Sequence, residues 1–289
     1  MPDGRASQSA PAWVTPTFRA RAPEPGALAR RLAERPLGPR RRLIMGNWKS
    51  HKSLAESRDW LEALPSAVDR LPSCELVVFP PATALSLMAG LLASSGRPVS
   101  LGAQTLSADP AGAHTGELTA EMLADAGARY VLIGHSERRS EQHETPAVTR
   151  AKFDRALAAG LTPVLCIGES REERLAHRTA RVLDDQLGAV LGDRPRLNTP
   201  VVLAWEPVWA IGTGLVPKLS DLAEAAELVA RSVERFGHPD LPLLYGGSVK
   251  RDNARELLSV EGYDGLLIGG AALDPGHLAD IALRCGGLS

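Results

Sequence analysis

Short apolar runs alternate with longer segments of mixed character from Leu43 onward. The runs are nearly continuous, which is typical of strands that are buried on both faces of a parallel sheet. The longer segments carry apolar residues at the spacing of one helix face. We therefore expect strands at residues 43–45, 75–79, 99–103, 130–133, 163–167, 201–205, 242–245 and 265–268.

Helices are expected between these strands, because the intervening segments are long enough and have helical periodicity. The clearest of them are residues 54–64, 117–125, 146–159, 171–191, 219–236 and 252–258. Eight strand–helix units in about 250 residues predict an α/β fold, a parallel (β/α)8 barrel that forms a single domain over residues 40–289. A doubly wound open sheet is the alternative, which periodicity alone does not separate from the barrel. The barrel predicts that chemical groups collect directly after the strands, as they do here.

The first 39 residues are rich in Arg, Ala and Pro and have no apolar periodicity, so we expect a disordered extension. Residues 1–42 carry nine arginines against three acidic residues, a formal charge of +6 that leaves −7 on the rest. The prolines would interrupt the amphipathic helix of an organellar import signal. An idle tail, or initiation near Val14 or Leu32, is the interpretation that we favour.

Composition narrows the function classes. With 289 residues and 44% hydrophobic content, the chain has ample material for a core, and a net charge of −1 argues against a general binder of nucleic acid or membrane surfaces. No apolar run reaches the length of a membrane span. Three widely spaced cysteines, Cys74, Cys166 and Cys285, form neither a disulfide framework nor a metal-ligand cluster, and they fit a reducing cytoplasm.

The sixth expected strand ends in a carboxylate, Glu206, followed by Pro207. Proline biases the preceding residue away from the α region, so the chain leaves the strand extended and turns there. Residues 208–211 are apolar but too few for a helix, and Gly212 and Gly214 give the next loop two flexible joints. We interpret this stretch as a catalytic base beside a mobile lid. A surface glutamate before an apolar turn is the alternative.

Other strand exits carry polar groups as well. Lys49 and Asn47, after the first strand, offer a positive charge and a hydrogen-bond donor to an anionic substrate. After the fourth strand, Ser136 is a suitable N-cap for a short helix, whose field would favour the neutral imidazole of His135. A neutral imidazole can donate a hydrogen bond to a carbonyl group. For Glu137 and the two arginines after it, a structural ion-pair cluster is as good an interpretation as a role in the site.

Paired glycines follow the seventh and eighth strands, as Gly246-Gly247-Ser248 and Gly269-Gly270. Their backbone N–H groups, near helix starts, suit a phosphate group, and in barrels these two loops are a common phosphate site. A long loop without helical pattern, residues 104–116, follows the third strand. Such a loop either docks into a partner subunit or is a flexible insertion.

These stretches resemble the triosephosphate isomerase family over residues 43–273, on the motifs GNWK (46–49), IGHSERR (133–139), CIGE (166–169), EPVWAIGTG (206–214), YGGSV (245–249) and IGGA (268–271). The resemblance implies a TIM barrel in which Glu206 is the base, His135 the electrophile and Lys49, with Asn47, a positive charge; these roles are taken from the family. It also implies a phosphate site formed by Gly212, Ser248, Gly269 and Gly270, with Ser136 and Glu137 in support. A cytoplasmic homodimer is implied too, in which Thr115 of one chain approaches Asn47 and Lys49 of the other.

The implied reaction interconverts dihydroxyacetone phosphate and D-glyceraldehyde 3-phosphate through an enediol(ate), in glycolysis and gluconeogenesis. One carboxylate that reaches both carbons can move the proton both ways, so neither metal nor organic cofactor is needed. The rivals are an isomerase of a four-carbon ketose phosphate, whose relatives tend to alter the first motif, and a barrel that binds without catalysis. Another phosphate-binding barrel would lack the second and fourth motifs. Trp205, Leu215 and His114 depart from the family pattern, and the first two bear on lid closure.

Overall fold

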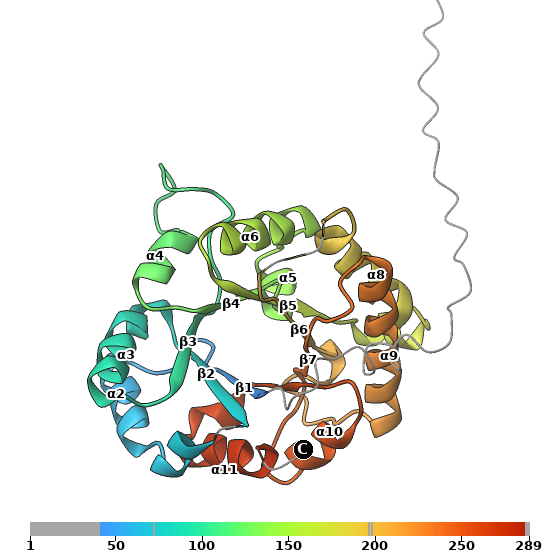
Figure 1. Ribbon diagram of the computed structural model, residues 1–289. Coiled ribbons are helices and arrows are strands. Elements are labelled where there is room, and N and C mark those ends of the chain that lie inside the picture. Colours follow the sequence, from blue (N-terminus) through green and yellow to red (C-terminus); the bar gives the residue numbers. More distant parts are fainter. Residues whose placement is uncertain (1–40, 72, 196, 198, 287–289) are drawn as a thin grey trace, which may run out of the picture.

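The computed structural model describes residues 41–71, 73–195, 197 and 199–286. Within them, eight parallel strands pair in chain order and the first pairs with the last, which closes the sheet into a barrel (Figure 1). The strands are β1 (Arg42–Asn47), β2 (Cys74–Phe79), β3 (Val99–Ala103), β4 (Tyr130–Ile133), β5 (Thr162–Ile167), β6 (Val202–Trp205), β7 (Leu243–Tyr245) and β8 (Gly265–Ile268). The closure confirms the (β/α)8 barrel and excludes the open sheet. The extension expected at residues 1–39 lies outside the described residues.

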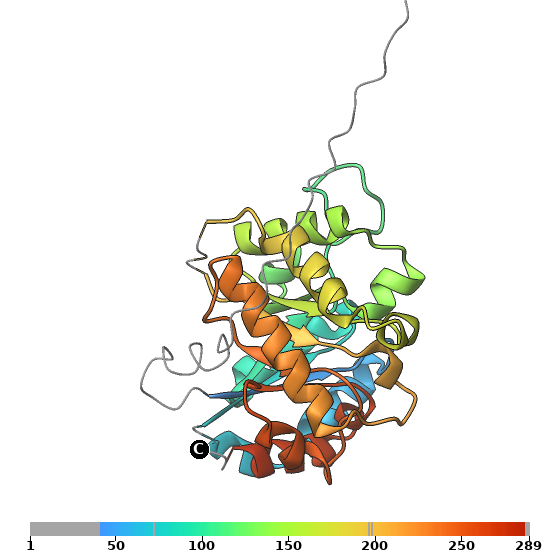
Figure 2. The ribbon, with the colours of Figure 1, turned by 90° about the vertical axis from the view of Figure 1, so that its right-hand side faces the viewer.

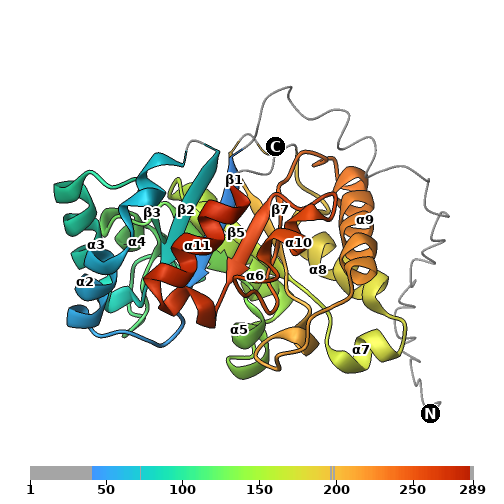
Figure 3. The same ribbon diagram turned by 90° about the horizontal axis from the view of Figure 1, so that it is seen from below.

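Helices surround the barrel, and side views show them outside the strands (Figure 2, Figure 3). The α-helices are α2 (Leu54–Ala63), α3 (Ala82–Ser95), α4 (Ala120–Asp125), α5 (Ser136–Glu141), α6 (Pro146–Ala158), α7 (Arg171–Leu175), α8 (Thr179–Leu191), α9 (Leu219–Arg235), α10 (Ala254–Ser259) and α11 (Pro275–Cys285). Three 3-10 helices accompany them in the described residues, η1 (Ser66–Arg70), η2 (Val208–Ala210) and η3 (Gly270–Leu273). No helix of this described part is long and apolar enough to cross a membrane.

The expectation of one helix over residues 171–191 is wrong, because the segment divides into α7 and α8. Ser170 and Glu173 form a capping box that starts the short α7. His177 then adopts a left-handed conformation, with φ of 54°, which a continuous α-helix does not allow. Two helices beyond the expected set, α3 and α11, are present as well. Pro81 before α3 and Gly96 at its C-cap are the sequence signals that mark its ends.

Apolar side chains form two layers, one on each face of the barrel wall. The larger cluster lies between strands and helices, and the smaller one fills the barrel interior, with Met45, Val77, Phe79 and Leu132 among its members. Because alternate residues of a strand point to opposite faces, both layers draw on the same strands. Gly102 leaves room for the ring of Phe79, since a Cβ there would lie 2.2 Å from it.

Closure of the barrel joins the two ends of the folded chain. In the pairing of β1 with β8, Leu43 lies opposite Gly265, and a Cβ at Gly265 would lie 1.9 Å from the Leu43 carbonyl oxygen. The guanidinium of Arg42 also donates a hydrogen bond of 2.5 Å to the carbonyl of Tyr263. Only a glycine therefore allows this strand pair to approach so closely at that position.

Candidate functional site

A cavity of about 390 Å³ opens at the C-terminal end of the strands. This is the end at which α5 and α7 lie, along the lower edge of Figure 3. The residues expected to act in catalysis and phosphate binding all line it: Asn47, Lys49, His135, Glu206, Gly212, Ser248, Gly269 and Gly270. They come from loops far apart in the sequence, and the parallel topology brings them to one end of the barrel.

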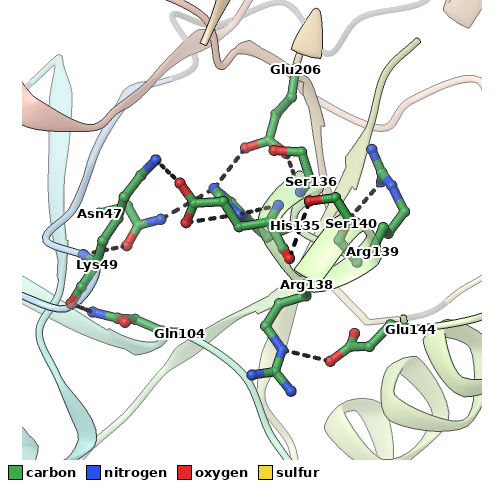
Figure 4. Close-up of polar contacts among 12 residues, drawn as sticks. Asn47, Lys49, Gln104, His135, Ser136, Arg138, Arg139, Ser140, Glu144 and Glu206 are labelled. Carbon is green, nitrogen blue, oxygen red and sulfur yellow. Dashed lines mark hydrogen bonds and ion pairs between the residues drawn. The ribbon is translucent and has the colours of Figure 1, made fainter. Parts of the chain in front are cut away.

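Glu206 lies at the exit of β6 and is 1% exposed. Its backbone N–H donates to the carbonyl of Ile167, so the adjacent strand fixes its position. One carboxylate oxygen, Oε2, accepts a hydrogen bond of 3.0 Å from the N–H of Ser136, and Oε1 lies 3.1 Å from Nε2 of His135 (Figure 4). The carboxylate is thus buried, and two consecutive residues of the loop after β4, His135 and Ser136, hold it.

His135 is itself the N-cap of α5, so the expectation that Ser136 is the cap is wrong. Nδ1 of the imidazole accepts the N–H of Glu137 at 3.3 Å. A nitrogen that accepts a hydrogen bond carries no proton in the neutral ring, which assigns the proton to Nε2. Ser136 becomes the first helical residue, and its free N–H is the one that Glu206 binds. The helix start therefore orients both side chains.

Asn47 and Lys49 stand across the cavity from Glu206 (Figure 4). Nδ2 of Asn47 lies 3.4 Å from Nε2 of His135, and its Oδ1 accepts the N–H of Lys49 at 2.9 Å. Lys49 has a left-handed backbone, with φ of 53°, and Nε2 of Gln104 donates to its carbonyl at 2.8 Å. Such strain in a non-glycine residue is typical of functional sites. The ammonium group forms an ion pair with Glu137.

Gln104 is a positioning group that sequence reasoning did not assign. Its side-chain amide donates to the carbonyls of both Lys49 and Phe79, at 2.8 and 2.9 Å. Gln104 follows β3 directly, as the other polar groups of the site follow their strands. This position is the feature of the sequence that marks it as a candidate site residue. The amide thus supports the strained turn after β1 from a neighbouring loop.

The two glycine-rich loops border the other side of the cavity. Gly269 is the N-cap of η3 and Gly270 its first residue, and a Cβ at Gly270 would meet nothing within 4 Å. At Gly269 the nearest atom to such a Cβ is Cε of Lys49, at 3.7 Å, so the ammonium-bearing side chain lies against this loop. After β7, the hydroxyl of Ser248 donates to the carbonyl of Ala210 at 2.6 Å, which ties this loop to the start of the expected lid. Gly212 in that segment has φ of 68°.

A buried carboxylate, Glu169, anchors the segment in which the lid was expected. It is 0% exposed and accepts hydrogen bonds from two indole N–H groups, that of Trp205 at 3.1 Å and that of Trp209 at 2.9 Å. The guanidinium of Arg174 lies 3.5 Å away and compensates the charge. Trp205, which departs from the family pattern, is thus a second indole donor to this carboxylate. Leu215, the other departure, is 54% exposed.

Three supporting residues are expected from the sequence. The structure places two of them beside the cavity and the third away from it. Ser136 and Glu137 lie beside the cavity and contact Glu206, His135 and Lys49 as described above. Thr115 lies far along the exposed loop between β3 and α4, which projects from the ring of helices (Figure 1). Within the described chain it does not join the site. The described residues also contain no group of three His, Cys, Asp or Glu side chains that could hold a metal ion.

The three cysteines are buried and free, and burial raises the pKa of each thiol. The pKa of Cys74 is raised to about 12 and that of Cys285 to about 11, while Cys166 has the charge of Glu206 beside it as a further cause. Cys166 belongs to the apolar cluster inside the barrel, so its burial indicates a packing role.

These thiols predict a loss of stability in alkali. In the unfolded chain the thiols ionise near their ordinary pKa, whereas in the folded protein they stay protonated. The contribution of each buried thiol to the free energy of unfolding is therefore fully present below about pH 9. Above this pH it falls by about 1.4 kcal/mol per pH unit for each thiol. The fall ends only as the pH passes the folded values near 11 and 12. Urea unfolding at pH 8, 9 and 10 measures this slope. A free energy of unfolding that stays level over this range would contradict the prediction.

A closed (β/α)8 barrel, with a carboxylate, an imidazole and an ammonium group in a cavity at the C-terminal end of its strands, places the chain in the class of TIM-barrel enzymes. The family model for triosephosphate isomerase matches residues 42–285, and the chain belongs to this family.

The chain matches nearly the whole length of relatives that carry this family's name. The triosephosphate isomerase of Ruegeria sp. (strain TM1040) is 48% identical over 240 residues, 81% of this chain and 93% of that protein. The one of Rhodopseudomonas palustris (strain BisA53) is 42% identical over 251 residues, 85% of this chain and 98% of that protein. The crystal structure of triosephosphate isomerase from Bartonella henselae superimposes with a TM-score of 0.76 at 38% identity, over 84% of this chain and 98% of that one.

Proposed function

We propose that this protein is a triosephosphate isomerase, which interconverts dihydroxyacetone phosphate and D-glyceraldehyde 3-phosphate in glycolysis and gluconeogenesis. The observation that supports this most directly is the approach of one buried carboxylate, one imidazole and one ammonium group at the barrel mouth, next to two glycine-rich loops. Family membership over residues 42–285 supports the same activity.

Glu206 would remove the proton from the carbon next to the substrate carbonyl and return it to the neighbouring carbon. For this its carboxylate must leave the N–H of Ser136, which holds it when no substrate is bound. Nε2–H of His135 would donate to the developing oxyanion, because its tautomer is fixed by the bond at Nδ1. Asn47 and the ammonium of Lys49 would add a donor and a charge from the opposite wall.

The phosphate group would lie against the N–H groups of Gly269 and Gly270, at the start of η3, with Ser248 and Gly212 beside it. The lid, residues 207–214, would close over the substrate and exclude water, which protects the enediol(ate) from losing phosphate. Trp209 sits at the start of this lid, so its bond to Glu169 has to adjust when the lid moves.

A coupled assay of the purified full chain tests this function. Dihydroxyacetone phosphate should be converted to glyceraldehyde 3-phosphate, and the reverse reaction should occur in the same preparation. Ketose phosphates with four carbons serve as the comparison substrate, since an isomerase on the same fold is the nearest alternative. A higher kcat/KM for the four-carbon substrate would replace the proposal with that alternative, and inactivity toward both would favour a binding protein.

We further propose a homodimer in which Thr115 of one chain approaches Asn47 and Lys49 of the other. The loop that carries Thr115 is closed at its base by a hydrogen bond of 2.8 Å from the N–H of Ser107 to the carbonyl of Leu118. Leu118 and Met122 beside it are 40% and 52% exposed, which gives a second copy apolar surface to bury.

Sedimentation velocity at assay concentrations is expected to give a dimer. Thr115→Arg should shift the protein toward monomer and reduce activity, because a long charged side chain would face the partner's site. Ser259→Arg, at an exposed position at the end of α10, is the matched control and should change neither. A wild-type monomer with full activity would contradict the dimer.

We propose the cytoplasm as the location. Free buried thiols, as found at Cys74, Cys166 and Cys285, are typical of a reducing compartment. Fractionation of cells that produce the full chain, with detection by antibody, tests this, and recovery from an oxidising compartment would contradict it.

A further inference from the structure

A second cavity, of about 520 Å³, lies at the opposite end of the barrel from the site described above. It is formed by the residues before β1 and β4, by the starts of β2 and β3, and by η1 with Leu71 after it. It is larger than the C-terminal cavity, of about 390 Å³, and shares no residue with it. Four arginines line it, with two acidic residues: Arg41, Arg70, Arg97, Arg129, Asp69 and Glu75.

One of these arginines is already fully engaged. Arg97 donates to both oxygens of Asp69, with the shortest contacts at 3.0 Å, and to the carbonyls of Leu61, Leu64 and Pro65 at 2.8–3.1 Å. This pair cancels in charge. Because it ties the end of α2 to the start of β3, it also gives the cavity a fixed rim.

The second acidic residue of the lining, Glu75, is likewise held in place. Oε1 of Glu75 accepts a hydrogen bond of 2.8 Å from the hydroxyl of Tyr130 and one of 3.0 Å from that of Ser100. These two neighbours come from β4 and β3, so the carboxylate is fixed by the barrel wall. A carboxylate can accept further hydrogen bonds, which suits it to a ligand hydroxyl group.

Arg41, Arg70 and Arg129 remain. Their guanidinium groups make no hydrogen bond or ion pair with any other residue that the structure describes. The three positive charges of these arginines exceed the one negative charge of Glu75, so a net charge of +2 remains around one concavity. A concave surface of low dielectric focuses such a field and raises the local concentration of anions.

We propose that this cavity is a second ligand site, which binds a hydroxylated organic phosphate. Guanidinium groups match phosphate oxygens in pairs, so Arg41, Arg70 and Arg129 hold the phosphate. Glu75 accepts a hydroxyl group of the ligand, and the apolar side chains of the wall, such as Leu71, contact its carbon skeleton. The volume is that of a pocket for a small molecule. The site is independent of the proposed isomerase reaction.

Calorimetric titration of the full chain tests the site, with ribose 5-phosphate and inorganic phosphate as probes. The Gly270→Asp variant removes interference from the C-terminal cavity, because it places a carboxylate where phosphate is expected and a Cβ there meets nothing within 4 Å. In this background we expect one equivalent of ribose 5-phosphate to bind, more tightly than inorganic phosphate. Adding Arg70→Gln and Arg129→Gln should weaken it at least about tenfold, since two charge-assisted contacts are lost.

Arg178→Gln with Arg181→Gln, exposed positions at the start of α8, is the control with the same change of charge, and it should leave the affinity unchanged. In an otherwise wild-type chain, Arg70→Gln with Arg129→Gln should keep isomerase activity within about twofold, as these residues lie at the other end of the barrel. Crystals of the wild-type chain soaked in tungstate give a second readout, independent of the Gly270→Asp variant. Equal affinity in all variants, or tungstate at the C-terminal cavity alone, would overturn the proposal.

Discussion

Replacement of Glu206 by glutamine is expected to lower kcat by at least about a thousandfold, the upper range for a general base. The amide has nearly the same shape but cannot take a proton from carbon. Its oxygen can still accept the N–H of Ser136, so the fold and the cavity should be kept. The coupled assay gives kcat and KM, and KM should change little, because the phosphate contacts lie on other loops.

The control for this variant removes a carboxylate from the surface. Glu62 is exposed on α2, and Glu62→Gln should retain wild-type kcat. Circular dichroism of both variants checks the fold. If Glu206→Gln retained more than about a tenth of the wild-type kcat, another group would have to be the base, since loss of a general base costs far more.

Gly168→Ala is expected to destabilise the protein by about 3 kcal/mol or more, at the upper end of overpacking effects. A Cβ at this position would lie 1.8 Å from the carbonyl oxygen of Glu206 and 2.5 Å from its carbonyl carbon. Both are backbone atoms, so no side-chain rotation relieves the overlap. The exits of β5 and β6 must move apart, which also displaces the carboxylate of Glu206. We therefore expect loss of activity together with a lower midpoint in urea unfolding.

Gly90→Ala is the matched control for this substitution. Gly90 lies exposed within α3, and an added Cβ would meet nothing within 4 Å. In a helix, alanine should be more stable than glycine by about 0.5–1 kcal/mol. Equal stability of the Gly168→Ala and Gly90→Ala variants would mean that β5 and β6 are not packed as closely as described.

The pattern of apolar residues predicts this fold well, because strands buried on both faces are recognisable as short continuous runs. All eight expected strands are found, as are the expected helices except over residues 171–191. That segment has apolar spacing throughout, and only the conformation of His177 interrupts it. A histidine with positive φ has no clear signature in a single sequence.

The sequence also predicts which residues meet in the C-terminal cavity, because a parallel barrel collects all strand exits at one end. It does not predict contacts that depend on side-chain direction. Examples are the amide of Gln104 on the carbonyl of Lys49 and the two indole groups on Glu169. The arginines of the second cavity lie in four separate segments, and only the closed barrel brings them together.

The pairing of β1 with β8 has a consequence for synthesis on the ribosome. Leu43 finds its partner in Gly265, more than 200 residues later. At typical translation rates this strand edge waits on the order of 10 to 40 s before its neighbour emerges. During that time the N-terminal strands expose an open, apolar edge that can pair with other chains. Folding in the cell should therefore depend on chaperones that bind nascent chains, even though the finished barrel has no free edge.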